Sequence, residues 1–130
     1  MGLDNGIMIK RATATPMAAV VFDEEWRESN GYDLEVAYWR KCWNVRDIIL
    51  DTLHVWSDND YECPMTIDDI INVINALKKM NKKNYLDCGG CIWTWPEFKS
   101  IQRRNIRNLR RLIRIMRRDK NLQVYFYDSY

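Results

Sequence analysis

The sequence has little of what catalytic and metal sites are usually built from. It contains one histidine, His54, and only 5 glycines among 130 residues. It has no glycine-rich phosphate loop, no dinucleotide-binding fingerprint, no Gly-x-Ser-x-Gly motif and no His-Glu-x-x-His motif. The adjacent acids Asp68 and Asp69 fall at a predicted helix start, where structure explains them. We therefore expect a protein that is not an enzyme and that uses no cofactor and no metal.

Long apolar runs are also missing. No run approaches the roughly 18 residues that cross a bilayer, and no basic segment followed by an apolar stretch marks a secretion signal. We therefore expect a cytoplasmic protein that makes no membrane contact and whose four cysteines are reduced thiols. Two of them, Cys88 and Cys91, have the spacing of metal ligands, but no second such pair accompanies them. The other two are Cys42 and Cys63.

Acidic residues are scarce near the end of the chain. Residues 1–98 hold 10 Lys and Arg against 16 Asp and Glu, a net charge of −6. Residues 99–130 hold 10 against 2, a net charge of +8. Three arrangements would neutralise the separated charges: pairing within the fold, pairing between two copies in a homodimer, and binding of an anionic partner by the basic end. Composition does not choose among them.

The chain length and the distribution of apolar residues predict a single α+β domain over residues 1–130. β-branched and aromatic content predicts strands at residues 6–11 and 122–128, with a weaker strand at 17–22. The strands at the two ends are expected to form a small antiparallel sheet that packs against three helices.

Helical periodicity predicts those three helices. The first covers residues 33–56, and the second covers 66–79, with Thr66 and Asp69 in a capping-box arrangement. The third covers 95–118, with Pro96 in its first turn, and residues 81–94 are expected to be a loop.

The predicted third helix is rich in arginine, and at about 100° per residue every arginine faces away from its apolar stripe. One interpretation is a solvated or internally salt-bridged face. The other is a binding face, because the guanidinium fork suits phosphates and carboxylates and like charges repel one another unless an anion is near. The candidate partner-binding residues are Arg103, Arg104, Arg107, Arg110, Arg111, Arg114, Arg117 and Arg118.

Arg46 lies on the apolar stripe of the predicted first helix, one turn after Trp43. A charge in that position must pair with an acid, extend to solvent or line a cavity. The simpler interpretation is an arginine stacked on Trp43 that either is salt-bridged or extends its charged end to solvent. The sharper hypothesis is an anion-binding pocket, for which the candidate residues are Trp39, Arg40, Trp43, Arg46, Tyr125 and Tyr127.

Three segments of the sequence resemble segments of a known protein family. They are Met-Gly-Leu-Asp at residues 1–4, Tyr-Trp-Arg-Lys at 38–41 and the closing Tyr-Phe-Tyr-Asp-Ser-Tyr at 125–130. Cys63 and the glycine-aromatic stretch at 90–95 add to them. In this order, the segments resemble a family of small phage and prophage proteins. The resemblance implies a phage accessory protein but no particular activity. The family often has a histidine where this chain has Arg46, so no histidine chemistry carries over.

Together these features predict a non-enzymatic phage accessory protein that binds a host component in the host cytoplasm. We expect it to inhibit a host defence, with an effector protein or an anionic nucleotide signal as its target. One alternative is a nucleic-acid-binding accessory protein that uses the arginine-rich helix. Another is a small metal-dependent or hydrolytic enzyme, in which His54 would act with Cys63 or a nearby acid.

Overall fold

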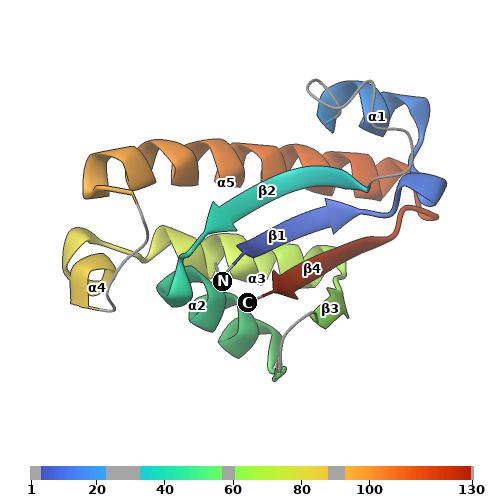
Figure 1. Cartoon of the computed structure of the whole chain (residues 1–130). Coiled ribbons are helices and arrows are strands. Elements are labelled where there is room, and N and C mark those ends of the chain that lie inside the picture. The colour runs from blue at the N-terminus through green and yellow to red at the C-terminus, as the bar shows by residue number, and fades with distance from the viewer. Residues whose placement is uncertain (1–3, 23–32, 57–60, 88–92, 130) are drawn as a thin grey trace.

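The computed structural model describes residues 4–22, 33–56, 61–87 and 93–129. Its centre is an antiparallel sheet of four strands in the order β2-β1-β4-β3 (Figure 1). The strands are β1 (Asp4–Ile9), β2 (Leu34–Arg40), β3 (Tyr61–Pro64) and β4 (Val124–Ser129). The α+β prediction, with both terminal strands in one antiparallel sheet, is therefore confirmed.

Helices cover one side of this sheet. Figure 1 shows the sheet in front, with α3 and the long α5 behind it. Helix α2 packs against α3, α3 packs against α5, and α5 also runs along β2. The helices are α1 (Pro16–Phe22), α2 (Trp43–Leu53), α3 (Ile67–Lys78), α4 (Lys82–Asp87) and α5 (Trp95–Arg118), preceded by a short 3-10 turn (Arg11–Thr13).

The terminal strands lie side by side at the middle of the sheet. Ile7 pairs with Phe126 and Ile9 pairs with Val124, and all four side chains are buried. Alternate residues of a strand face opposite sides, so these apolar side chains face the helices together. Burial of this pattern explains why segments at opposite ends of the chain meet.

Helices α3 and α5 begin where the sequence predicts. Thr66 Oγ1 accepts from the amide of Asp69 at 3.1 Å, and the Asp69 carboxylate accepts from the amide of Thr66 at 2.9 Å. At the start of α5, Thr94 Oγ1 accepts from the amide of Glu97, and Pro96 occupies the first turn. Both starts are set by local capping, which the sequence displays directly.

The strand predicted at residues 17–22 is wrong, because this segment is helix α1. Pro16 begins the helix, where its missing N–H costs nothing. Thr15 Oγ1 accepts from the amide of Ala18 at 3.3 Å and so supports the first turn. These helix-starting signals outweigh the β preference of the valine pair that follows.

The long helix predicted over residues 33–56 is also wrong in its first half. Residues 34–40 form β2, which pairs with β1, and the helix begins only at Trp43. Between them Lys41 takes a left-handed backbone with φ of 54°, which separates strand from helix. The apolar stripe suggested a helix, but pairing with a distant strand decides the conformation.

Two further elements are missing from the predictions. Helix α4 lies within the expected loop, and Asn81 and Asn84 cap it by each accepting a hydrogen bond from the other's amide. Strand β3 is short and pairs only with β4, with Pro64 at its end. A proline is tolerated there because an edge strand does not need every N–H.

Three amide side chains dock α5 on β2. Gln102 Oε1 accepts from Trp39 Nε1 at 2.8 Å, Asn105 Nδ2 donates to the Tyr38 carbonyl at 2.9 Å, and Asn108 Nδ2 donates to the Val36 carbonyl at 3.2 Å. Because β2 is an edge strand, its outer carbonyls have no neighbouring strand to bond. Asn105 and Asn108 supply donors to two of these carbonyls. Together with the Gln102–Trp39 bond, they determine how α5 is rotated about its axis.

We predict that Asn105→Leu destabilises the protein by about 2 kcal/mol, because it leaves the Tyr38 carbonyl without its donor in a buried place. Urea denaturation of the variant and the wild type measures the change. The matched control is Asn75→Leu at an exposed position of α3, where a change within about 0.5 kcal/mol is expected. Equal stability of the Asn105 variant and the wild type would contradict this role.

Candidate functional site

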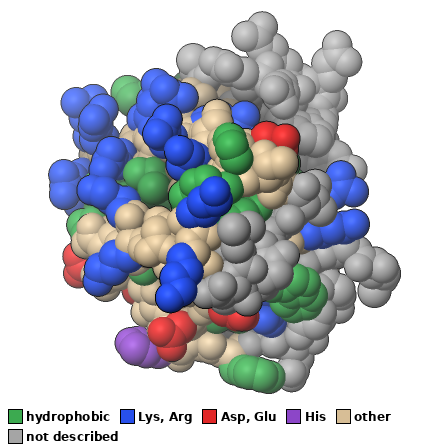
Figure 2. Space-filling view, turned by 90° about the vertical axis from the view of Figure 1, so that its left-hand side faces the viewer, with side chains coloured by type: hydrophobic (Ala, Val, Ile, Leu, Met, Phe, Trp, Pro, Cys, Tyr) green, Lys and Arg blue, Asp and Glu red, His purple; other side chains and the backbone are tan. Residues whose placement is uncertain are grey.

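The exposed side of α5 carries all eight arginines predicted as a binding face. Every one of them is exposed, and at about 100° per residue they occupy roughly 140° of the helix circumference. Leu109, Leu112 and Met116 on the opposite side are buried. Figure 2, which views the molecule from one end, shows Lys and Arg side chains gathered on one side of that view. We call Arg103, Arg104, Arg107, Arg110, Arg111, Arg114, Arg117 and Arg118 the arginine face.

The arginine face makes no ion pair with any residue that the structure describes. The ion pairs among the described residues all lie elsewhere. Lys10 pairs with Glu62 at 3.0 Å, and Arg46 pairs with Asp47 at 3.4 Å and with Asp128 at 3.0 Å. Internal salt bridging to the described residues therefore does not explain the face. Its arginines stand three and four residues apart, as at 107, 110, 111 and 114, so they repel one another.

Two grooves border the arginine face. The α3–α5 groove has a volume of about 400 Å³, and Arg103 and Arg110 are among its lining residues. The α5–β2 groove has a volume of about 280 Å³ and lies on the other flank, where Arg104, Arg107 and Arg111 line it. Five of the eight arginines thus stand at the edge of a groove.

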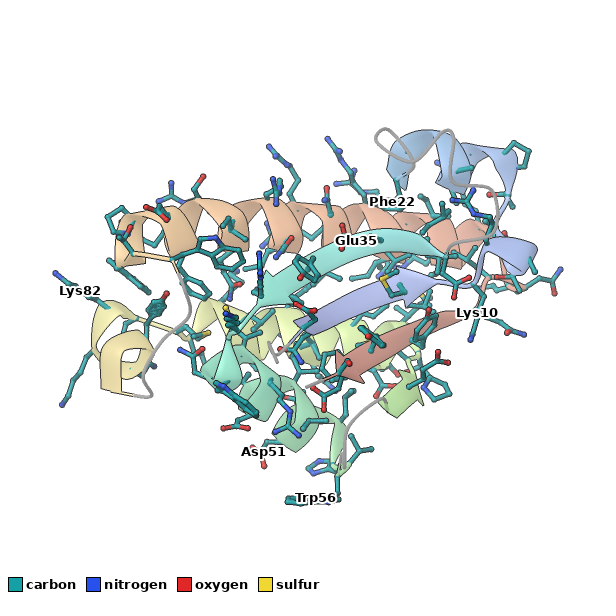
Figure 3. The ribbon with its side chains drawn as sticks, viewed as in Figure 1. Lys10, Phe22, Glu35, Asp51, Trp56 and Lys82 are labelled. Carbon is teal, nitrogen blue, oxygen red and sulfur yellow. The ribbon has the colours of Figure 1, made fainter. Side chains whose placement is uncertain are left out.

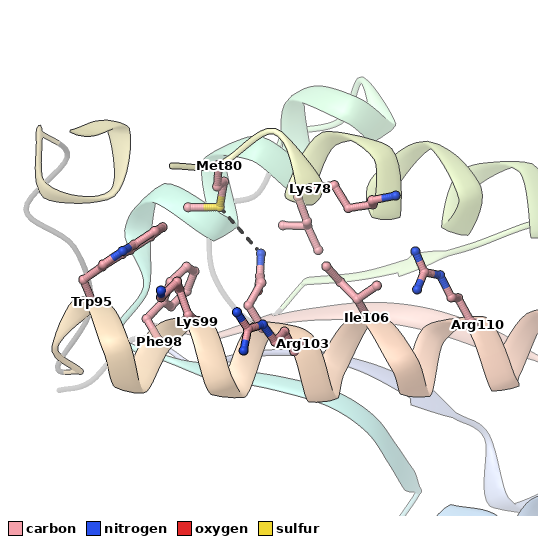
Figure 4. A pocket seen from close by; sticks show the side chains of 10 residues that line it. Lys78, Met80, Trp95, Phe98, Lys99, Arg103, Ile106 and Arg110 are labelled. Atoms are coloured by element: carbon pink, nitrogen blue, oxygen red, sulfur yellow. Dashed lines mark hydrogen bonds between the residues drawn. The ribbon is translucent and has the colours of Figure 1, made fainter. Parts of the chain in front are cut away.

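The grooves differ in chemistry. The α3–α5 groove combines an apolar floor, which includes Trp95 and Phe98, with four cationic side chains (Figure 4). The α5–β2 groove is mostly polar, and its lining includes an acid, Glu35 of β2, and Phe22 of α1, both labelled in Figure 3. An anion is therefore better accommodated in the α3–α5 groove, where none of the described lining residues is acidic.

Arg46 is held by a buried carboxylate. Its Nε donates to both oxygens of Asp128 at 3.0 Å, and Asp128 is fully buried. Asn5 Nδ2 also donates to Asp128, at 2.7 Å, and the guanidinium of Arg46 lies 5.4 Å from the ring centre of Trp43. This geometry matches the salt-bridged arginine stacked on Trp43. It links α2 to the two central strands.

Two other residues of the predicted ligand pocket, Trp39 and Tyr125, make hydrogen bonds elsewhere in the fold. Trp39 is fully buried and its indole N–H is bound to Gln102. The hydroxyl of Tyr125 donates to Asp33 at 2.5 Å, and burial followed by this hydrogen bond raises the pKa of Tyr125 above its usual range. Neither groove described above is lined by any of the six candidates, which are Trp39, Arg40, Trp43, Arg46, Tyr125 and Tyr127.

One cysteine corrects the expectation of four reduced thiols. Cys42 is disulfide-bonded, whereas Cys63 is a buried thiol. A disulfide needs its two Cα atoms within about 7 Å, a distance that composition does not reveal. Cys88 and Cys91 lie outside the described residues. Within the described ranges, no group of three or more His, Cys, Asp or Glu side chains is placed to hold a metal ion.

The remaining catalytic candidates occupy structural positions. His54 is the C-cap of α2, with a left-handed φ of 56°. Asp68 and Asp69 lie in the first turn of α3, where Asp69 completes the capping box. A carboxylate at a helix start interacts favourably with the helix dipole, so their places at helix ends explain these side chains.

The sequence pattern did not predict the α3–α5 groove, because it indicated Trp95 as the start of the third helix and as part of the glycine-aromatic stretch at 90–95. One signal was present: Gln102 is a polar residue on the apolar side of α5, about one turn after Phe98. A buried amide needs hydrogen-bond partners, so the position of Gln102 indicates that another polar group lies against the apolar side of α5.

Comparison with protein-family models, with curated proteins and with solved structures yields no match. Among the described helices, none is both long enough and apolar enough to cross a bilayer.

We predict that Asp128→Asn destabilises the protein by about 3 kcal/mol, since it removes the buried carboxylate from the largely buried Arg46 and leaves only the exposed Asp47. Thermal or urea unfolding measures the loss. Glu62→Gln is the matched control, because it breaks the exposed pair with Lys10 and should cost less than about 1 kcal/mol. If the two variants lose the same stability, the buried pair has no special structural role.

Proposed function

We propose that this protein is a non-enzymatic binding protein that holds an anionic partner on the arginine face of α5. The observation that carries the proposal is the set of eight exposed arginines without an ion pair to any described residue. Arginine forms bidentate hydrogen bonds with phosphates and carboxylates. An anion placed there would remove the repulsion among the guanidinium groups.

The dimensions of the arginine face favour an extended partner. From Arg103 to Arg118 the helix rises roughly 22 Å, at about 1.5 Å per residue. A single small ion would neutralise only part of such a row. The face is also held in place, because Asn105 and Asn108 anchor the helix to β2. A rigid row of donors loses less entropy on binding than a flexible one.

The charge distribution along the chain supports a directed encounter. The segment that contains α5, residues 99–130, has a net charge of +8, while residues 1–98 have −6. Such an uneven distribution orients an approaching anion toward the basic end. A second copy of this chain, which carries its own acidic segment, is one partner that this pattern would attract.

From the resemblance to small phage proteins we infer a partner in the cytoplasm of a host cell. There we propose a component of host defence, either an acidic effector protein or an anionic nucleotide signal. Nucleic acid is a second candidate, because a row of guanidinium groups also follows a phosphate backbone. We propose no catalytic role, since His54 and Asp69 serve as helix caps.

We predict that replacing four arginines of the face by glutamine (R107Q/R111Q/R114Q/R118Q) weakens binding to a labelled polyanion at least about tenfold. Each lost charge-assisted contact costs roughly 1 kcal/mol or more, and their effects combine. Fluorescence anisotropy with polyglutamate and with a single-stranded oligonucleotide, at several salt concentrations, measures the change. Preference for polyglutamate indicates an acidic protein, and preference for the oligonucleotide indicates nucleic acid.

The control variant K79Q/K82Q/K83Q/K120Q removes the same charge at exposed positions away from the arginine face. It should retain binding within about threefold, because it leaves every arginine of the face in place. Equal losses in both variants would show that net charge alone attracts the probe. Failure of the wild-type protein to bind either probe would overturn the proposal.

A further inference from the structure

The α3–α5 groove holds features that a docked polyanion does not require. It is a hollow of about 400 Å³ on one flank of the arginine face, within the range of roughly 300–1,000 Å³ typical of small-molecule sites. Arg103 and Arg110 belong to both the groove and the face, and the remaining wall is made by α3, the segment after it and the first turns of α5.

The floor of the groove is aromatic and held rigidly. The Trp95 ring packs on Phe98 with ring centres 5.9 Å apart, and on Tyr85 with ring centres 5.4 Å apart. Tyr85 in turn stacks on Phe98 at 4.4 Å, and its hydroxyl donates to the Trp93 carbonyl. Trp95 is only partly buried. A fixed, partly open aromatic ring is a surface on which a planar ring can stack.

Gln102 directs a hydrogen-bond donor toward Met80, which also lines the groove. Its Oε1 accepts from Trp39 Nε1 at 2.8 Å, and because an indole N–H can only donate, the orientation of the amide is set. Its Nε2 then lies 3.7 Å from the sulfur of Met80, the contact drawn as a dashed line in Figure 4. A thioether is a weak acceptor. A carbonyl oxygen or ring nitrogen of a ligand would be a better partner for this N–H.

Four cations line the groove above that floor. Lys78, Lys99, Arg103 and Arg110 are all exposed, and Figure 4 shows them on both sides of the groove, Lys78 from α3 and the others from α5. The Nζ of Lys99 lies 5.9 Å from the ring centre of Trp95. Positive charge therefore stands next to the aromatic surface rather than far from it.

We infer that the α3–α5 groove binds a nucleoside phosphate. The base stacks on Trp95, an acceptor on its edge receives the Gln102 N–H, and the phosphate meets Arg103, Arg110 and the two lysines. An uncharged apolar ligand would leave the four cations unused, and inorganic phosphate would leave the aromatic floor in water. The groove thus matches a ligand that is planar and aromatic at one end and anionic at the other.

This inference deepens the proposed function and rests on it through Arg103 and Arg110, which the groove and the arginine face share. The nucleoside phosphate has two sources with the same chemistry: a free mononucleotide, or a base exposed on a single strand that runs along the arginine face. In both cases the base binds in the groove and the arginines bind the phosphate.

The test is isothermal titration calorimetry of the wild-type protein with the nucleoside 5′-monophosphates, with the matching nucleosides and with inorganic phosphate. We expect at least one monophosphate to bind about tenfold or more tightly than its nucleoside and than phosphate, because stacking and charge act together. If no monophosphate binds better than inorganic phosphate, the groove does not recognise a base and the inference is wrong.

Two pairs of substitutions separate the groove from charge elsewhere on the surface. R103Q/R110Q removes the groove arginines, whereas K83Q/K120Q removes two exposed lysines that line neither described groove and changes the net charge equally. We expect at least a tenfold loss of monophosphate affinity in the first pair and less than a twofold change in the second. Equal losses would mean diffuse charge attraction and would overturn the groove site.

A third variant, Ile106→Trp, fills the groove and keeps every charge, with circular dichroism to check the fold. It should abolish binding of the monophosphate, or, if the natural source is a strand, remove the base-dependent part of oligonucleotide binding. Unchanged base-dependent binding in this variant would contradict the inference. If the wild type binds polyglutamate or an oligonucleotide through the arginine face but shows no base dependence, the inference fails while the proposed function stands.

Discussion

The structure depends on how α5 is fastened to the edge of the sheet. Gln102, Asn105 and Asn108 are three residues apart, so their amides lie along one side of the helix and meet β2 in succession. Asn105 and Asn108 bond to backbone carbonyls and Gln102 bonds to a buried indole, so the helix can rotate little about its axis. Once that side faces β2, the apolar residues face the core and every arginine must face outward. The same contact orients the Gln102 N–H toward the α3–α5 groove.

Arginine serves two opposite purposes in this protein, and burial separates them. Arg46 is largely buried and is held by Asp128, which also takes a hydrogen bond from Asn5. A charge removed from water needs such a partner, because its desolvation is costly. The arginines of α5 stay in water and pair with no described residue. Their charge is therefore available to a partner, whereas that of Arg46 is used within the fold.

The arginine face and the α3–α5 groove form one continuous surface with two kinds of recognition. The face offers charge and length, which favour an extended anion and determine little about its identity. The groove offers an aromatic ring and a single oriented amide donor, which respond to shape and to hydrogen-bond pattern. Arg103 and Arg110 connect the two. A partner that uses both would gain affinity from the first and specificity from the second.

Local chemistry in the sequence determined the ends and the chemical character of several elements. Thr66 with Asp69 started α3, Pro96 with Thr94 started α5, and the periodicity of α5 alone placed its arginines opposite the core. The sequence did not reveal that residues 34–40 form a strand, because that choice depends on pairing with β1, distant along the chain. The arginine face was therefore predictable, and the groove was not. A groove exists only where α3 and α5 pack together, and that packing is a property of the tertiary structure.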